Sequence, residues 1–477
     1  MLTTYVIFRI ITVLYFLVVA ATILVVILEK RQPVKTMAWT LVLIALPVAG
    51  ILLFYFFGQD IRKERRFQRR EINQMKRKDL ANYLPHDNAR IPESCKPLAT
   101  FFLRRNFAPP FLLGTTKVFQ CGEDKFISLL KDIANAKEHI NLEYFIFEGD
   151  AIGRIVSDFL KDAVKRGVVV RIMYDDVGCW SVKNKFYNDM SAAGIIVKSF
   201  MPVRFSRFTR RVNYRNHRKI AVIDGKIGYI GGMNIAMRYL YGRNGEGWKD
   251  MHLRLTGSAV YGLQQTFMAD WYYNCNEMLA TSWFYPQTKN EESEHRGCLQ
   301  IVTASPASEL PYIMNGFVWA IMNARKYFYL TTPYLMPTEQ VLNAIQVAAC
   351  AGIDVRIMVP AKSEHYWIKA ANESYYGDVL KAGAKVYAYG PEFIHAKYFV
   401  CDDMLCTVGS TNTDFRSFED NFEANAFIYD EKLAVNLKNR FENDLRSCEF
   451  ISRRRWNKRS KIQRVAESFV RIVSPLL

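Results

Sequence analysis

Two short runs of this 477-residue chain carry the same reactive side chains at the same spacing. One is Asn216-His217-Arg218-Lys219-Ile220-Ala221-Val222-Ile223-Asp224, and the other is Ile394-His395-Ala396-Lys397-Tyr398-Phe399-Val400-Cys401-Asp402. With each histidine counted as zero, both runs have lysine at +2 and aspartate at +7, followed by glycine at +14 and asparagine at +17. The chain therefore contains the pattern H-x-K-x4-D twice.

Two such histidines suit the cleavage and transfer of a phosphodiester. A neutral imidazole can attack phosphorus and form a phosphohistidine, while a protonated imidazole donates its proton to the leaving alkoxide and later activates the acceptor hydroxyl. Because histidine titrates at about pH 6.5, its neighbours can hold one ring neutral and the other charged. Lys219, Lys397, Asn234 and Asn412 would give charge and hydrogen bonds to the phosphate oxygens, so we expect no metal and no cofactor.

A structural explanation competes with this one, because a lone histidine beside a strand is more often structural. We assign the other five histidines to that class: His86, His139, His252, His295 and His365. Two matched copies at equivalent places in a repeat are a much more specific signal.

The segments before each run also repeat. Residues 139–147, 167–174 and 193–200 have counterparts at 326–335, 352–359 and 382–389. All are short, rich in β-branched and aromatic residues, and separated by helix-length segments, which predicts two similar α/β lobes of the sandwich type. A repeat of about 185 residues is too long for a solenoid and indicates a duplicated domain.

Within each lobe a hairpin would position the reactive residues. We expect strands over residues 219–223 and 227–230. Residues two apart on a strand point the same way, so His217 and Lys219 project together, and the returning strand brings Asn234 beside them.

The aspartates of the pattern fall at the turns of these hairpins. The first turn is Asp224-Gly225, and the second is Asp402-Asp403, a poorer hairpin sequence. Asp224 and Asp402 belong to the signature, and their place at a turn favours a structural role for both.

Two apolar stretches at the N-terminus, Tyr5–Leu28 and Met37–Phe57, each have about the 20 residues that cross a bilayer core. Arg9 is the one charged residue in the first stretch, and the second has none. A cleaved signal peptide is the alternative for the first, but its apolar run is too long and a second run follows at once. We expect a two-helix transmembrane hairpin.

The formal net charge of +18 would suit nucleic acid, an anionic membrane or a phosphorylated substrate. Basic residues gather beside the predicted spans: Lys30, Arg31, Lys35, Arg62, Lys63, Arg65, Arg66, Arg69, Arg70, Lys76, Arg77 and Lys78. The longer group follows the second span, which places the rest of the chain in the cytoplasm by the positive-inside rule. Such a collar attracts an anionic membrane surface, although it can also be a solvated helix that only sets topology. No base-stacking module is visible, so we expect no nucleic-acid partner.

The paired motifs resemble the phospholipase D superfamily, and within it the chain is similar to the bacterial cardiolipin synthases over nearly its whole length. The matching stretches are Asn213–Lys219, Gly231–Asn234, Gly247–Asp250, Thr332–Pro337, Phe393–Lys397, Asp414–Ser417, Asn421–Glu423 and Ser474–Leu477. The resemblance implies that one phosphatidylglycerol gives its phosphatidyl group to histidine and releases glycerol. A second phosphatidylglycerol then accepts the group and becomes cardiolipin in the bacterial cell membrane.

The resemblance also implies roles for single residues. His217 would be the nucleophile and His395 the acid and base, although the near symmetry of the copies leaves the order open. Asp250 and Glu423 would be the carboxylates that orient the two imidazoles.

Other functions share these motifs. A hydrolytic phospholipase D, or a phosphatidyltransferase that uses serine, would need the same histidines, and a non-catalytic membrane scaffold is a third class. The apolar spans favour a lipid acceptor over water. Neither the acyl-chain preference nor the oligomeric state can be deduced from the sequence.

The predicted layout has five parts. Two transmembrane helices in residues 1–60 precede a basic juxtamembrane linker over 61–115, a first lobe over 116–296 and a second over 297–450. The last part, 451–477, alternates basic and apolar residues, as expected for an amphipathic helix that lies on a membrane or packs on its own domain.

Overall fold

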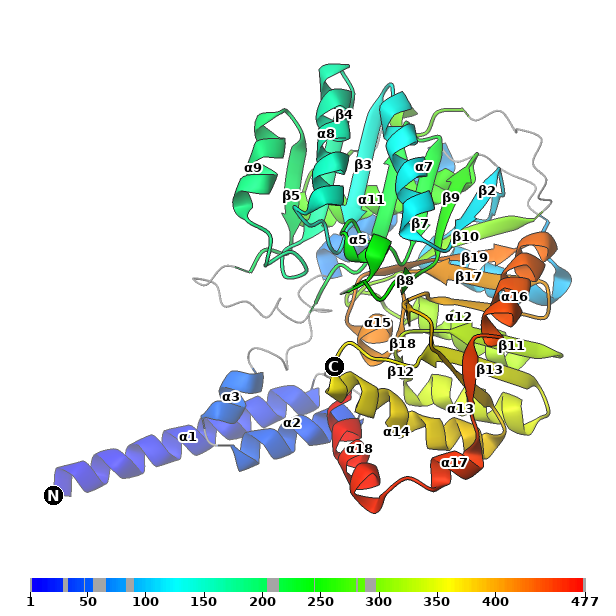
Figure 1. Ribbon diagram of the computed structural model, residues 1–477. Helices are drawn as coiled ribbons and strands as arrows, with labels where there is room; N and C mark the ends of the chain where they lie inside the picture. The colour runs from blue at the N-terminus through cyan, green and yellow to red at the C-terminus, as the bar shows by residue number, and fades with distance from the viewer. Residues whose placement is uncertain are drawn as a thin grey trace. The chain divides into compact units, whose positions relative to one another are not determined.

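The computed structural model describes residues 2–28, 33–46, 48–54, 66–82, 90–203, 214–243, 245–279, 282–287 and 297–474 (Figure 1). The chain divides into two compact units, a small one of residues 1–66 with 203–214 and a large one of residues 67–202 with 215–477. The loop residues 29–32, the basic residues Arg62, Lys63 and Arg65, His86, His295 and the last three residues lie outside the described part.

The first lobe of the large unit is built on a seven-stranded sheet in the order β2-β9-β7-β6-β3-β4-β5. The strands are β2 (Thr116–Phe119), β3 (His139–Tyr144), β4 (Val169–Asp175), β5 (Ile196–Phe200), β6 (Lys219–Ile223), β7 (Ile227–Gly231) and β9 (His252–Thr256). The helices are α7 (Gly122–Asn135), α8 (Ala151–Lys165), α9 (Asn184–Ala192), α10 (Arg238–Tyr241) and α11 (Ala259–Cys275). Figure 1 shows α7 and α8 on one face of this sheet and α11 on the other.

Strand β3 shows why the sheet is covered on both faces. Ile140, Leu142 and Tyr144 alternate along it and join the core beneath α7 and α8. Asn141, between them, points the other way and donates to Gln264 of α11 at 3.3 Å. Every residue of β3 is therefore buried.

The second lobe is built on a nine-stranded sheet in the order β1-β10-β19-β17-β16-β11-β13-β14-β20. Its strands are β1 (Phe111–Leu112), β10 (Cys298–Ala304), β11 (Tyr327–Thr331), β13 (Asp354–Pro360), β14 (Lys385–Tyr389), β16 (Tyr398–Cys401), β17 (Leu405–Gly409), β19 (Glu423–Tyr429) and β20 (Cys448–Ile451). Its helices are α6 (Lys96–Asn106), α12 (Tyr312–Asn323), α13 (Glu339–Cys350), α14 (Tyr366–Ala382), α15 (Phe415–Glu419) and α16 (Glu431–Leu445).

The seven central strands of this sheet repeat the order of the first sheet. In the first sheet β3, β4 and β5 are parallel neighbours, and β3, β6, β7 and β9 are antiparallel neighbours. In the second sheet β11, β13 and β14 are parallel in the same way, and β11, β16, β17 and β19 are antiparallel. The predicted α/β class with two similar lobes is confirmed by this repeat.

The expected linker over 61–115 differs from the structure in its second half. Strand β1 pairs with β10, and Leu98 and Phe102 of α6 lie in the core of the second lobe. Helix α5 (Arg66–Asn82) also packs on the lobes, because Gln265 donates to the carbonyl of Lys76 at 3.2 Å. Apolar residues of this segment complete a core formed by residues far along the chain, which local composition does not reveal.

Two short sheets join distant segments. Strand β8 (Trp248–Lys249) of the first lobe pairs with β15 (Phe393–Ile394) of the second, and β12 (Leu335–Met336) pairs with β18 (Thr413–Asp414). The β8–β15 pair ends beside Asp250 and His395, so it brings these two residues of different lobes together.

The C-terminal segment forms α17 (Arg453–Asn457) and α18 (Lys461–Val473). Val470 of α18 is buried against α14, and Ser474 shares a hydrogen bond of 2.8 Å with Tyr375. Four other apolar side chains of α18 are largely exposed: Ile462, Val465, Phe469 and Ile472. The helix therefore packs on its own domain along one face and leaves an apolar face open.

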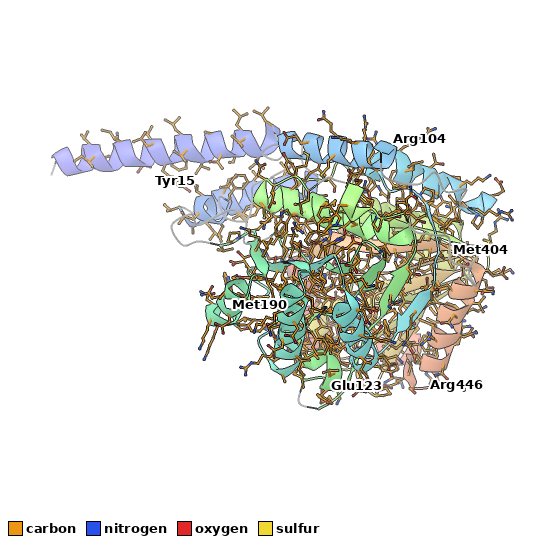
Figure 2. The ribbon with its side chains drawn as sticks, turned by 90° about the horizontal axis from the view of Figure 1, so that it is seen from above. Tyr15, Arg104, Glu123, Met190, Met404 and Arg446 are labelled. Carbon is orange, nitrogen blue, oxygen red and sulfur yellow. The ribbon has the colours of Figure 1, made fainter. Side chains whose placement is uncertain are left out.

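The small unit contains α1 (Leu2–Leu28), α2 (Pro33–Ala45) and α3 (Ala49–Leu53). Val19 and Val26 of α1 pack with Leu43 and Phe54, while Figure 2 shows other side chains of α1 standing out along its length. By length and composition, residues 5–26 form the one described helix that can cross a membrane. The second predicted span is divided between α2 and α3, and its residues 47 and 55–57 lie outside the described part. The two-helix hairpin is thus not confirmed.

Candidate active site

In each pattern the histidine lies just before a β-hairpin and the aspartate lies at its turn; the hairpins are β6–β7 in the first lobe and β16–β17 in the second. Asp224 has a φ of 53° and Asp402 a φ of 50°. Each carboxylate accepts three consecutive backbone N–H groups at 2.7 to 3.0 Å, from residues 137–139 and 325–327 respectively. These aspartates tie the hairpin turn to the loop before the neighbouring strand, and neither lines the cavity described below.

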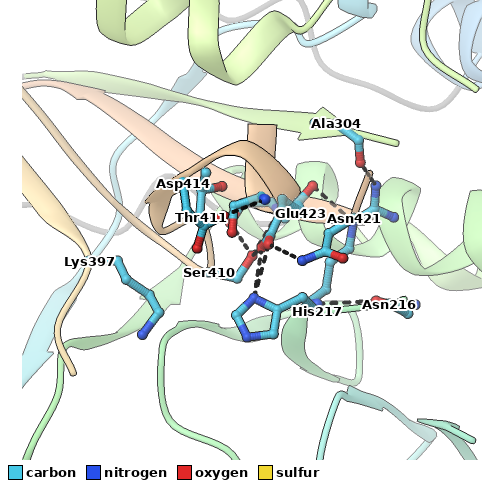
Figure 3. Close-up of polar contacts among 12 residues, drawn as sticks. Asn216, His217, Ala304, Lys397, Ser410, Thr411, Asp414, Asn421 and Glu423 are labelled. Carbon is cyan, nitrogen blue, oxygen red and sulfur yellow. Dashed lines mark hydrogen bonds and ion pairs between the residues drawn. The ribbon is translucent and has the colours of Figure 1, made fainter. Parts of the chain in front are cut away.

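His217 of the first lobe meets Glu423 of the second. Its Nδ1 lies 3.0 Å from Oε1 and 3.2 Å from Oε2 of Glu423 (Figure 3). The same carboxylate accepts hydrogen bonds from the hydroxyl of Ser410 and, at 3.4 Å, from the amide of Asn421. The backbone N–H of His217 donates to the carbonyl of Phe422 at 2.9 Å, so the ring and the backbone are both held by one strand end.

His395 of the second lobe meets Asp250 of the first in the same way. Its Nδ1 lies 2.7 Å from Oδ2 of Asp250 and 2.9 Å from Nζ of Lys397. The backbone N–H of His395 donates to the carbonyl of Lys249 at 2.7 Å. Each histidine is therefore oriented by the carboxylate of the opposite lobe.

Both histidines and both predicted phosphate-binding asparagines line one cavity of about 310 Å³. The other lining residues come from both lobes: Phe145, Ile146, Arg215, Arg238, Tyr239, Arg243, Trp248, Tyr334, Met336, Glu364, Ile368, Asp414, Arg416 and Asn421. With Nδ1 of each ring taken up by a carboxylate, Nε2 is the nitrogen that can react with a bound group.

The asparagines are fixed to different degrees. Asn234 accepts the N–H of Ile146 at 3.0 Å and donates to the hydroxyl of Tyr239. The side-chain carbonyl of Asn412 is buried without a hydrogen bond from the described protein. An unpaired buried carbonyl of this kind costs free energy, so a ligand with a donor would stabilise it.

The lysines lie behind the histidines instead of in the cavity wall. Nζ of Lys219 donates to the carbonyl of His217, and Nζ of Lys397 donates to the carbonyl of His395. Burial lowers the pKa of Lys219 well below its usual value and lowers the pKa of Lys397 to about 8. Both lysines position the histidine backbone, and Lys397 also keeps a positive charge beside His395 at neutral pH.

Burial also governs the protonation of the rings. Loss of hydration lowers the pKa of His217 and of His395 to about 4, against the opposing effect of their carboxylates. Although burial would raise it, the pKa of Glu423 is held below its usual value by His217 and Lys219. Both imidazoles are therefore neutral at neutral pH until a charged ligand arrives.

Arg218 is a residue of this site that sequence reasoning did not single out. Its guanidinium is buried between the lobes, pairs with Asp270 and donates to the carbonyls of Glu423 and Ala304, both at 3.0 Å. It thus clamps the His217 segment to the strand that carries Glu423. An arginine between two motif residues, directly before the strand predicted over 219–223, was the available signal.

The duplicated fold and the paired motifs around one cavity define a member of the phospholipase D superfamily. The family described as "Cardiolipin synthase, PLD-like domain" matches residues 129–271 and 317–445, and the "Phospholipase_D-nuclease N-terminal" family matches residues 13–59. The chain is 37% identical to the major cardiolipin synthase ClsA of Bacillus subtilis, over 97% of this chain and 98% of that protein. It is 36% identical to a cardiolipin synthase of Oceanobacillus iheyensis over the same shares.

Among solved structures, the phosphatidylserine synthase of Haemophilus influenzae has the same fold, with a TM-score of 0.60 and 15% identity over 80% of this chain and 100% of that one. The chain thus belongs to the cardiolipin synthase family.

Proposed function

We propose that this protein synthesises cardiolipin by transferring a phosphatidyl group between two molecules of phosphatidylglycerol. The observation that carries the proposal is the pair of crossed histidine–carboxylate contacts that face one cavity. Relatives named cardiolipin synthase, aligned over nearly the whole chain, support the choice of substrate.

In the first half-reaction, Nε2 of His217 attacks phosphorus and the bond to the glycerol oxygen breaks. His395 gives its Nε2 proton to that oxygen, so free glycerol leaves and a phosphatidyl-histidine remains. Because both rings are neutral without ligand, the negative charge of the bound phosphodiester must raise the pKa of His395 for it to carry this proton.

In the second half-reaction, His395 takes the proton from a glycerol hydroxyl of the second phosphatidylglycerol. The oxygen attacks phosphorus, the P–N bond breaks, and cardiolipin and neutral His217 result. Asp250 and Glu423 keep each Nδ1–H in place, while Asn234, Asn412 and Lys397 offset charge on the phosphate oxygens. The scheme uses no metal, so a chelator should leave the rate unchanged.

Purified protein given phosphatidylglycerol as its sole lipid tests the proposal. We expect cardiolipin and free glycerol in equal amounts. Phosphatidic acid without cardiolipin would show a hydrolytic phospholipase D instead, which is the alternative function for this site.

We further propose that residues 1–60 cross the bacterial cell membrane twice and leave the lobes in the cytoplasm. The candidate span at residues 5–26, the match of residues 13–59 to an N-terminal family and the exposed apolar side chains of α2, such as Leu41 and Ile44, support an anchor. Protease treatment of oriented vesicles tests this topology, because the lobes should be cut only from the cytoplasmic side.

The open face of α18 supports an anionic membrane surface as a partner. Phe469 and Ile472 are 68% and 74% exposed, and Lys461 and Arg464 of the same helix are exposed as well. An apolar stripe bordered by basic residues suits the headgroup region of a bilayer. Phe469→Ser with Ile472→Ser should lower activity in anionic vesicles but not in detergent micelles, whereas Ile127→Ser, an exposed apolar residue of α7, should change neither.

A further inference from the structure

Glu364 is a carboxylate in the wall of a cavity that must hold an anionic phosphodiester. A negative charge there opposes phosphate binding, so we looked for a different part of the substrate that this carboxylate could bind. The other acidic lining residue, Asp414, accepts the N–H of Ser417 at 2.7 Å and caps α15, which accounts for its place. Glu364 caps no helix, because its contacts are with side chains.

Two side chains hold the Glu364 carboxylate. The hydroxyl of Tyr334 donates to Oε2 at 3.0 Å, and the guanidinium of Arg243 lies 3.1 Å from Oε1. Tyr334 and Glu364 belong to the second lobe and Arg243 to the first. A carboxylate can accept about four hydrogen bonds, so these two contacts within the described part of the chain leave about two positions for a ligand.

Glu364 and His395 line the same cavity. Burial and Lys397 lower the pKa of His395, whereas the charges of Asp250 and Glu364 oppose that change. His395 is the residue that exchanges a proton with a glycerol oxygen in the proposed reaction. The glycerol that exchanges this proton therefore lies in the cavity that Glu364 also lines.

We propose that Glu364, aimed by Tyr334 and Arg243, is the subsite for the glycerol headgroup. It accepts hydrogen bonds from the glycerol hydroxyls next to the reacting oxygen, both in the leaving glycerol and in the acceptor. The subsite rests on the proposed function and adds to it a residue that selects polyol acceptors over water and simple alcohols. Hydrogen bonds to a charged carboxylate compensate for the repulsion between that carboxylate and the phosphate.

Glu364 could instead serve only to hold the two lobes together through its ion pair with Arg243. A second ion pair gives a matched control for this alternative. Glu246 and Lys362 form a second ion pair between the same two loops, at 3.2 Å, with both side chains more than half exposed and outside the cavity wall. Glu246→Gln therefore removes an inter-lobe ion pair without touching the subsite.

The experiment supplies the full-length protein with phosphatidylglycerol in detergent micelles and equal concentrations of isotope-labelled glycerol and ethanol. Labelled phosphatidylglycerol and phosphatidylethanol then report the choice of acceptor. We expect the wild-type protein to prefer glycerol, Glu364→Gln to lower that preference by about tenfold, and Tyr334→Phe, which keeps the charge, by about threefold. Glu246→Gln should keep the wild-type preference, and the ratio of cardiolipin to phosphatidic acid should fall in the same order.

Unchanged acceptor preference in Glu364→Gln or in Tyr334→Phe, with transfer still occurring, would overturn the subsite alone. An equal fall in Glu246→Gln would overturn it as well, because lobe contact would then explain the effect. No transfer product from the wild-type protein would overturn the proposed function, and the subsite with it.

Discussion

The two lobes carry the same motif in the same hairpin, yet the groups behind their histidines differ. His217 faces Glu423, whose carboxylate is also held by Ser410 and Asn421. His395 faces the shorter Asp250 and has Lys397 beside the same nitrogen. The repeat in sequence is therefore not a repeat of two independent sites, because each lobe supplies the carboxylate of the other.

One residue position explains how two carboxylates of different length fit. Fifteen residues after each histidine, the first lobe has Gly232 and the second has Ser410. A Cβ on Gly232 would lie 2.1 Å from Oδ1 of Asp250, whereas the Ser410 hydroxyl donates to Glu423. The missing side chain makes room for aspartate, and the serine supplies a donor to glutamate.

Replacing the histidines should have the largest effect. We expect His217→Ala to lower cardiolipin synthesis by at least about a thousandfold and to abolish a trapped phosphatidyl–protein adduct. His395→Ala should slow both half-reactions by about 10²–10⁴-fold, because it removes the acid and base but not the nucleophile. Mass spectrometry of the acid-quenched protein detects the adduct, and full activity in either variant would refute the two-histidine scheme.

Substitutions of the two carboxylates test whether each histidine is oriented by the carboxylate of the opposite lobe. We expect Glu423→Gln and Asp250→Asn each to lower the rate by about a hundredfold, since an amide no longer selects the right imidazole tautomer. Glu423→Gln should mainly impair adduct formation, as His217→Ala does, although Glu423 lies in the other lobe. If each variant instead resembled the histidine of its own lobe, the contacts seen here would not be those of the working enzyme.

Substitutions at the equivalent positions Gly232 and Ser410 should lower kcat to different extents. Gly232→Ser forces Asp250 away from His395 and should cost about tenfold or more in kcat. Ser410→Ala removes one donor to Glu423 and should cost about threefold. Steady-state kinetics with matched protein amounts give both values, and a larger loss in Ser410→Ala would reverse the comparison.

The turn aspartates should behave alike and affect stability more than rate. Asp224→Asn and Asp402→Asn keep a residue that tolerates positive φ but weaken three N–H contacts, so each should lower the free energy of unfolding by about 1–3 kcal/mol. We expect kcat to change by less than about twofold. A loss of rate with unchanged stability would instead give these aspartates a part in the chemistry.

The smallest expected effect is on how the stability of the protein depends on pH. In the folded protein the pKa of His217 and of His395 is about 4, below their usual value of about 6.5. The unfolded chain therefore binds more protons between these values, and stability falls as the pH falls through that window. Between about pH 7 and pH 5, Tm should fall less in His217→Gln and in His395→Gln than in the wild-type protein, by similar amounts. Equal pH dependence in all three proteins would contradict neutral buried rings.

Much of the fold could be predicted from the sequence because the repeat is local. The strands over 219–223 and 227–230 follow from two short apolar runs on either side of a turn, and β6 and β7 have nearly these bounds. The second turn forms despite its poorer Asp402-Asp403 sequence, because Asp402 binds three backbone N–H groups and both residues adopt positive φ. Packing thus compensated for a weak local signal.

Other expectations were incomplete for the same reason. The segment over 61–115 contains α6 and β1, whose apolar residues join a core made by strands some 190 residues later. Arg218 fills an unspecified position of its motif, and the cavity residue Glu364 belongs to no motif. Their surroundings come from other parts of the chain, so their neighbouring residues in sequence did not indicate a role.

The sequence by itself determined that two H-x-K-x4-D motifs lie in a duplicated domain, because a spacing of two along a strand and the turn after it are local properties. Only the tertiary structure decided which carboxylate serves which histidine. The contacts join Glu423 to His217 across 206 residues and Asp250 to His395 across 145. Such pairs form through the packing of two whole lobes, and no local pattern contains that information.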